Sequence, residues 1–154
     1  AYAFQESSRR KINLEYTTKL GIPEGPLLGK LQQGKNIQFK GKTVKAGKAT
    51  HLIEGRRITY ITDTSLTESC YIIAKNADLL ICESTFSKKE ETKAKETHHL
   101  TAGQAATIAK KAKCQALALM HYSQRYKSPA LLLKEAQAIF KNTRAMNDFD
   151  VLEL

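Results

Sequence analysis

The stretch "ADLLICESTF", residues 77–86, sets the class of fold. Its apolar run is short, begins after Asp78 and stops at Glu83, so we interpret residues 78–84 as a strand. In a sheet flanked by helices, side chains at the carboxyl end of a strand leave the core and face a crevice. Glu83 therefore occupies a place where ligands collect.

Working outward, strand-like and helix-like segments alternate on both sides of this stretch. Such alternation predicts βαβ units, an α/β fold with helices packed on a mixed or parallel sheet. Thr101 with Gln104 fits a capping box, and Ser128 before Pro129 fits a helix start. The further predicted strands are 56–62, 114–122 and 150–154, and the predicted helices are 68–77, 101–113 and 128–142.

The first third of the chain has a different character. Residues 11–20 have rough helical spacing closed by Gly21, and residues 21–34 hold prolines and glycines that predict a break in regular structure. In residues 35–47, apolar and polar side chains alternate on both sides of a Lys-Gly-Lys sequence, and this pattern predicts a hairpin. We expect one incomplete domain, with residues 1–55 a basic, loop-rich segment and residues 56–154 the core that carries the site.

Charge is unevenly distributed along the 154 residues. Lys and Arg number 25 against 15 Asp and Glu, and residues 1–60 hold 12 of the basic and only 4 of the acidic side chains. This excess favours a surface for polyanions such as phosphate backbones, although a solvated lysine-rich face gives the same count.

The cysteines and the hydropathy of the chain indicate the cellular compartment in which we expect the protein. Cys70, Cys82 and Cys114 are an odd number without CxxC spacing and lie in apolar surroundings, which is typical of buried, reduced thiols in the cytoplasm. No apolar run approaches the roughly 20 residues of a membrane helix, so we expect a soluble chain without a membrane partner. The chain opens "AYAFQESS", without Met, and we interpret it as a fragment or processed product.

Polar residues end two further predicted strands. The strand at 56–62 leads into Asp63, and the strand at 114–122 reaches His121. Together with Glu83, and with His98 and His99 just before a capped helix, they bring carboxylate and imidazole to one region. These ligand types suit zinc, manganese or iron, and favour a hydrolytic metal site.

Four blocks of sequence carry a family resemblance. Residues 60–64 "YITDT", 77–86 "ADLLICESTF", 98–106 "HHLTAGQAA" and 120–126 "MHYSQRY" resemble, in order and spacing, the ribonuclease Z family of the metallo-β-lactamase superfamily. Residues 20–34, "LGIPEGPLLGKLQQG", also resemble that family's segment before the Asp strand. The resemblance implies half of an αββα sandwich, and a metal-dependent endoribonuclease that removes the 3′ trailer from precursor transfer RNA.

The resemblance also implies roles for particular residues. Asp63 would bridge two zinc ions and His121 would be a zinc ligand. His99 would be the catalytic histidine, paired with Glu83 so that it can protonate the leaving 3′ oxygen, and Arg125 would bind phosphate oxygens. Each residue also has a plainer interpretation: Asp63 capping a turn, Glu83 a structural acceptor, Arg125 paired with a carboxylate.

This sequence departs from the family pattern in three respects. It reads His-His-Leu at 98–100 where a single His followed by Ser is usual, so His98 could take the role of His99, and Cys82 stands where a His is common. The superfamily's H-x-H-x-D-H block is missing, since the histidines here are His51, which we assign to the surface, His98, His99 and His121.

Counting ligands shows what the missing block means. A zinc ion takes about four ligands, more than Asp63 and His121 supply for a pair of ions. We therefore expect the C-terminal half of a longer enzyme, with the N-terminal half absent or on another chain, inactive alone and leaving apolar sheet surface exposed. By resemblance the complete enzyme would be a homodimer using zinc, or manganese.

Two other classes of function remain open. One is a different metallo-β-lactamase-fold hydrolase that acts on small phosphodiesters. The other is a non-catalytic basic module that binds RNA and scaffolds a partner.

Overall fold

The computed structural model describes residues 1–153, which form two compact units. The larger unit comprises Ala1–Gln5 and residues 56–153, and the smaller comprises Glu6–Gly55. The sequence placed residues 1–5 with the basic segment, whereas the structure pairs them with the sheet of the larger unit. Their alternation of Tyr2 and Phe4 with small residues suits an edge strand.

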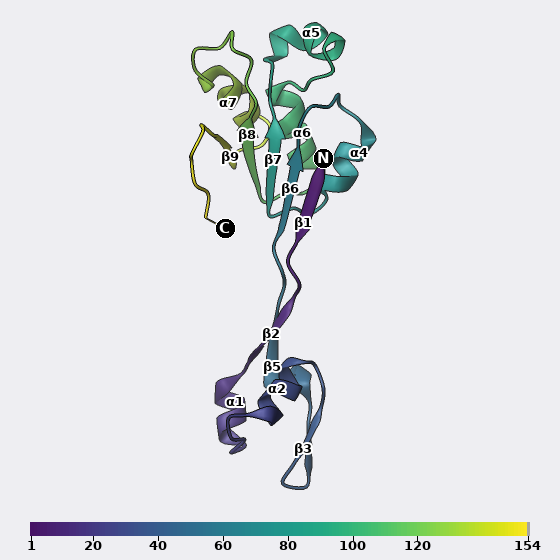
Figure 1. Cartoon of the computed structure of the whole chain (residues 1–154), viewed down its shortest axis with the longest axis vertical. Helices are drawn as coiled ribbons and strands as arrows, with labels where there is room; N and C mark the ends of the chain where they lie inside the picture. Colours follow the sequence, from purple (N-terminus) through teal and green to yellow (C-terminus); the bar gives the residue numbers. More distant parts are fainter. Residues whose placement is uncertain (154) are drawn as a thin grey trace. The chain divides into compact units, whose positions relative to one another are not determined.

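A mixed sheet organises the larger unit, in the order β1-β6-β7-β8-β9 (Figure 1). The edge strand β1 runs antiparallel to β6, and the four strands from β6 to β9 run parallel. The α/β class with a mixed sheet is confirmed. The strands are β1 (Tyr2–Gln5), β6 (Arg57–Ile61), β7 (Leu79–Glu83), β8 (Ala116–Met120) and β9 (Thr143–Ala145).

Helices cover one face of this sheet. Leu80 and Cys82 of β7, with Leu117 and Leu119 of β8, point into a core shared with the helices. The predicted capping box is present at Thr101, whereas Pro129 and not Ser128 is the N-cap of the last helix. The elements between the strands are α4 (Glu68–Ala74), the 3₁₀ helix η1 (Lys88–Glu90), α5 (Glu91–Glu96), α6 (Ala102–Lys111) and α7 (Ala130–Gln137).

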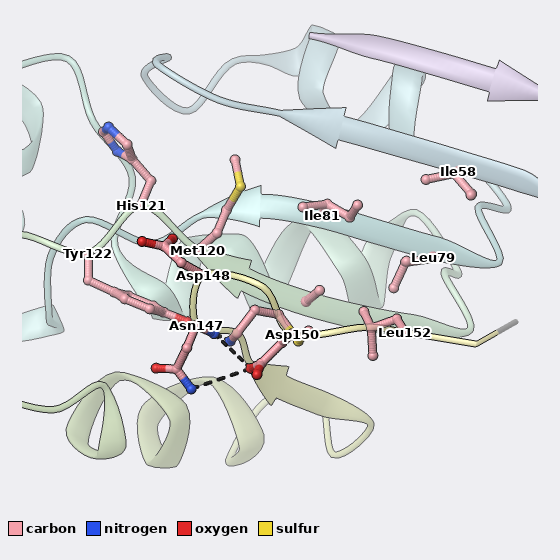
Figure 2. A pocket seen from close by; sticks show the side chains of 12 residues that line it. Ile58, Leu79, Ile81, Met120, His121, Tyr122, Asn147, Asp148, Asp150 and Leu152 are labelled. Atoms are coloured by element: carbon pink, nitrogen blue, oxygen red, sulfur yellow. Dashed lines mark hydrogen bonds between the residues drawn. The ribbon is translucent and has the colours of Figure 1, made fainter.

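The opposite face of the sheet carries apolar side chains without helices packed on them. Because side chains alternate along a strand, Leu79 and Ile81 point away from the helices that Leu80 and Cys82 contact. They border a hollow of about 930 Å³, which Figure 2 shows from close by. The further sheet residues along the hollow are Ile58, Ala118 and Met120.

The smaller unit has a core of its own. Its strands β2 and β5 pair antiparallel, and the predicted hairpin is present as β3 and β4. Residues 21–34, predicted to lack regular structure, instead contain α2, because Pro26 begins the helix where its missing N–H costs nothing. The elements are β2 (Arg9–Ile12), α1 (Leu14–Lys19), α2 (Pro26–Gln32), β3 (Ile37–Phe39), β4 (Lys42–Val44), α3 (Ala46–Ala49) and β5 (Thr50–Ile53).

Two expectations about the ends of elements were wrong. The closing strand is β9, at Thr143–Ala145, and residues 150–153 of the predicted strand at 150–154 are irregular, while residue 154 lies outside the described residues. The predicted helix at 11–20 is in fact the end of β2 followed by α1, since Asn13 accepts a hydrogen bond from the backbone of Tyr16 and starts the helix there.

Two simpler expectations concern the thiols and the membrane. Cys70, Cys82 and Cys114 are buried and unpaired. Among residues 1–153, every helix is too short or too polar to cross a membrane.

Candidate active site

The site lies where three neighbouring parallel strands end. β6 stops at Ile61, two residues before Asp63; β7 ends in Glu83; and β8 stops at Met120, next to His121. Because β6, β7 and β8 are parallel neighbours, these three ends lie at one edge of the sheet.

Asp63 and His121 leave their strands through strained turns. Their φ angles are 47° and 57°, in the left-handed region that costs an ordinary residue about 1–2 kcal/mol. Such conformations persist where the surrounding structure fixes them, and they gather at functional sites. Here they aim the two side chains at each other: His121 Nε2 lies 3.5 Å from Asp63 Oδ1.

Glu83 is the fully buried centre of the site. Its Oε1 accepts the backbone N–H of Thr64 at 2.7 Å. Its Oε2 accepts from Leu100 N at 3.1 Å, from His99 Nδ1 at 2.9 Å and from Thr85 Oγ1 at 2.9 Å. A buried carboxylate is tolerated where donors surround it, as they do here. Glu83 thus ties together the segments that follow β6 and β7 and the segment that precedes α6.

His99, and not His98, faces Glu83. His99 Nδ1 also lies 3.7 Å from Asp63 Oδ1, and its ring centroid is 5.4 Å from that of His121. His98 has a φ of 59° just beyond the end of α5, and its Nδ1 faces the Ser65 hydroxyl at 3.3 Å. His98 is therefore the residue that follows the C-cap of α5, whereas His99 lies in the site.

The capping box of α6 helps to place His99. Phe86, in the segment after β7, pairs with the residues around Thr101: Phe86 N–H donates to Leu100 O at 3.2 Å, and Ala102 N–H donates to Phe86 O at 2.9 Å. His99 therefore lies between a fixed helix start and the end of β7.

Thr85 is a site residue that we did not predict from the sequence. Its hydroxyl lies 3.0 Å from His121 Nδ1 and 2.9 Å from Glu83 Oε2. The signal was available, because residues two apart in extended chain point to the same side, and Thr85 is two residues after Glu83.

Arg125 contacts a carboxylate. Its Nη1 donates to Glu90 Oε1, and its Nε donates to Ser123 Oγ at 3.0 Å. The Tyr126 hydroxyl donates to the other oxygen of Glu90, and this hydrogen bond, followed by the pairing with Arg125, lowers the pKa of Glu90. Arg125 is thus paired with a carboxylate, which is the alternative to phosphate binding that the sequence left open.

Asp63, His99 and His121 together could hold a metal ion. One ligand atom from each lies within 4.8 Å of those of the other two. A carboxylate with two imidazoles fits zinc or a similar transition metal in donor type. The set is smaller than the four ligands or so that each zinc takes, so these residues fit part of a metal centre. The hollow over the open sheet face reaches this edge, since His121 also lines it (Figure 2).

Comparisons with known proteins place the chain in a family. A model of the beta-lactamase superfamily domain matches residues 31–122. The chain is 40% identical to ribonuclease Z of Enterococcus faecalis, covering 99% of this chain and 50% of that protein. It is 40% identical to ribonuclease Z of Archaeoglobus fulgidus, covering 99% and 51%. The chain spans about half the length of the curated relatives it matches.

Solved structures agree with this placement. The short form of human tRNase Z aligns with a TM-score of 0.51 and 31% identity, over 68% of this chain and 37% of that one. A metallo-beta-lactamase fold protein from Bacillus subtilis aligns with a TM-score of 0.55 and 25% identity, over 72% and 45%.

Proposed function

The chain belongs to the beta-lactamase superfamily, and from this premise we propose that it is the C-terminal half of a zinc-dependent phosphodiesterase that removes the 3′ trailer from precursor transfer RNA. The observation that carries the proposal is one cluster at one sheet edge: His99 on the buried Glu83, with Asp63 and His121 beside them. Similarity to ribonuclease Z over nearly the whole chain supports the substrate class.

In this proposal Asp63 and His121 hold zinc together with ligands from the N-terminal half. When bound, zinc would polarise the phosphodiester as a Lewis acid and help to activate water. Manganese has similar ligand preferences and is an alternative working metal.

Of the three residues that could hold a metal ion, His99 is the one that contacts Glu83, and in this proposal it supplies the proton and does not bind the metal. Its Nδ1 donates to Glu83 Oε2, which holds the ring in place and fixes its orientation. The other ring nitrogen, Nε2, is then the atom that can protonate the leaving 3′ oxygen. Arg125 would contact phosphate by exchanging Glu90 for a phosphate oxygen, since guanidinium binds either anion with similar geometry.

The smaller unit, Glu6–Gly55, would bind the RNA backbone. It contains 10 Lys and Arg side chains against 4 Asp and Glu. Such an excess attracts nucleic acid largely irrespective of sequence, and the attraction weakens as salt rises. We extend the proposal to a cytoplasmic homodimer, supported by the buried unpaired thiols for the compartment and by the family resemblance for the dimer.

The test is cleavage of precursor transfer RNA by the chain produced together with its N-terminal half. We expect trailer release by the pair and none by the 154 residues alone. Asp63→Ala and His99→Ala should each lower the rate by at least about 100-fold. Asp78→Asn is the matched control, because Asp78 lies at the opposite end of β7, where it accepts hydrogen bonds from the backbone N–H of Arg57 and from the Gln115 side chain.

Other results would point to the other classes of function. Cleavage near the parent rate after Asp63→Ala would remove the catalytic assignment. Hydrolysis of a small chromogenic phosphodiester, without cleavage of precursor transfer RNA, would indicate a different hydrolase of the superfamily. RNA binding without any cleavage by the pair would indicate a non-catalytic module.

A further inference from the structure

The Thr85 hydroxyl lies between the Glu83 carboxylate and the His121 imidazole. It is 2.9 Å from Glu83 Oε2, 3.0 Å from His121 Nδ1 and 3.0 Å from the backbone oxygen of His121. Thr85 is only 6% exposed, so water has little access to replace any of these contacts. Three polar atoms thus compete for one hydroxyl group.

Counting protons decides the direction of these hydrogen bonds. A hydroxyl has one proton to donate and lone pairs with which to accept. Glu83 Oε2 and the backbone oxygen of His121 can only accept, so the proton of Thr85 is directed to them. The contact with His121 Nδ1 is then a hydrogen bond only if the histidine donates.

We propose that Thr85 is a positioning residue that holds His121 with its proton on Nδ1, leaving the lone pair of Nε2 directed at the metal position. Nε2 is the atom that lies 3.5 Å from Asp63 Oδ1. A histidine that binds a metal through one nitrogen commonly donates the other N–H to an oxygen, which fixes the ring and its tautomer. The inference rests on the proposed function in one respect, that a metal binds there.

The backbone around Thr85 supports the same role. Ser123 N–H donates to the Thr85 backbone oxygen at 3.1 Å, and Ser84 N–H donates to Met120 O at 2.9 Å. These bonds tie the segment after β7 to the segment after β8. The hydroxyl is therefore held at a fixed distance from the imidazole.

The arrangement also links His121 to His99. Both Thr85 Oγ1 and His99 Nδ1 donate to the same oxygen of Glu83. His99 contacts that oxygen directly, whereas His121 reaches it only through Thr85. Removing the hydroxyl should therefore change the tautomer of His121 and leave the contact of His99 in place.

The experiment measures the tautomer in the 154-residue chain without metal. Nitrogen-15 spectra of the imidazole rings distinguish protonated from unprotonated nitrogens, and only four histidines need assignment, each by its own His→Gln variant. At about pH 8.5, where ordinary imidazoles are neutral, we expect the proton of His121 on Nδ1. Thr85→Val should shift it to Nε2, as in a free side chain, while Thr85→Ser should keep it on Nδ1.

A matched control separates this effect from general destabilisation. Thr59 is buried as well, and its hydroxyl donates to a backbone oxygen, that of Ile73. Thr59→Val should leave the spectrum of His121 unchanged. A proton on Nε2 of His121 in the parent chain would overturn the proposal, even if Thr85→Val failed to fold, and so would an unchanged tautomer in Thr85→Val.

Zinc affinity gives a second readout in the chain completed with its N-terminal half. We expect Thr85→Val to weaken zinc binding about 10- to 100-fold, and Thr85→Ser to bind like the parent. Equal affinity of Thr85→Val and the parent would count against the role of Thr85 in metal binding. Absence of precursor cleavage together with the expected tautomers would refute the proposed function and leave the assignment of Thr85 intact.

Discussion

Among residues 1–153, three of the seven non-glycine residues with a left-handed backbone lie at or beside the site. Asp63, His98 and His121 all have φ between 47° and 59°, although none is glycine. At Asp63 and His121 the turn directs the two side chains toward each other, in the position of the proposed metal site. At His98 the same conformation lies just past the end of α5, the position that glycine favours. The shared backbone angle therefore has two different causes.

This difference predicts opposite results at the adjacent histidines. His98→Gly should keep the free energy of unfolding or raise it by up to about 1 kcal/mol, because glycine adopts this conformation without strain. It should also leave precursor cleavage by the completed protein near the parent rate, whereas His99→Ala should abolish it. Urea unfolding and a cleavage assay measure the two effects.

Lys95→Gly is the control for His98→Gly. Lys95 is exposed inside α5, where glycine should cost about 1 kcal/mol. If His98→Gly lost cleavage while His99→Ala kept the parent rate, His98 would be the catalytic histidine and His99 would not.

The buried Cys114 thiol predicts a pH dependence. Burial raises the pKa of Cys114 from 9.0 to about 11, and its thiol donates to Ala74 O at 3.3 Å. A group with a raised pKa in the folded state stabilises the fold below its ordinary pKa, and this contribution is lost as pH rises. The free energy of unfolding should therefore fall between about pH 9 and pH 11, by at most about 2 kcal/mol from this group.

Comparison with Cys114→Ala isolates that contribution. Tyr122, whose pKa burial also raises, titrates in both proteins and cancels in the comparison. We expect the difference in urea-unfolding free energy between parent and variant to shrink from pH 9 to pH 11. A difference that stays constant over this range would contradict the assignment.

At the scale of elements, the start of α6 connects helix stability to the site. Thr101 Oγ1 accepts from Gln104 N at 3.2 Å, and the Gln104 side chain accepts from Thr101 N at 2.9 Å. Leu100, the residue before this box, donates its N–H to Glu83. The capping box therefore fixes one of the donors that surround the buried carboxylate.

Removing the box should cost stability and disturb the site. Thr101→Ala should lower the free energy of unfolding by about 1 kcal/mol, while Thr101→Ser should retain most of it. Urea unfolding measures the loss, and the nitrogen-15 signal of His99 should shift in the alanine variant. Equal stability of all three proteins would mean that α6 is held by packing alone.

Elements with strong local signals were predictable from the sequence. The strand of 78–84 and the capped helix of 101–113 correspond to β7 and α6 because apolar pattern and end residues agree there. The strand β9 was missed because its Thr-Arg-Ala sequence is short and polar; it forms by pairing with β8. In contrast, residues 150–153 pair with no strand, although Val151 and Leu152 gave that segment an apolar pattern.

The site was predictable to a different extent. Polar residues at the ends of parallel strands were visible as a pattern in the sequence. The structure brings three of them, Asp63, Glu83 and His121, to one edge of the sheet. The choice between His98 and His99 was open, because it depends on where α5 ends. The contact of Arg125 with Glu90 joins residues 35 apart, and no local pattern encodes it.

At the scale of the whole molecule, the face of the sheet opposite the helices is the feature left to explain. Ile81 and Met120 lie on it beside the hollow of about 930 Å³, at the edge that also carries His121. Residues of the C-terminal segment line the same hollow (Figure 2), among them Met146, Asp150 and Leu152. Large apolar patches on proteins commonly mark interfaces. The relatives are about twice as long as this chain, so the additional length is sufficient to supply a second sheet for this face.

We therefore predict that this face binds the N-terminal half and completes the metal site. Ile81→Lys should prevent co-purification of the two halves, because a lysine buried between two sheets would lose its hydration. Ile72→Lys is the matched control, since Ile72 on α4 is 67% exposed.

Elemental analysis should find less than about 0.2 zinc per chain in the 154 residues alone and nearly two in the pair. If Ile81→Lys binds the N-terminal half and zinc as the parent does, another surface joins the halves. Nearly two zinc in the chain alone would mean that its own residues complete the centre.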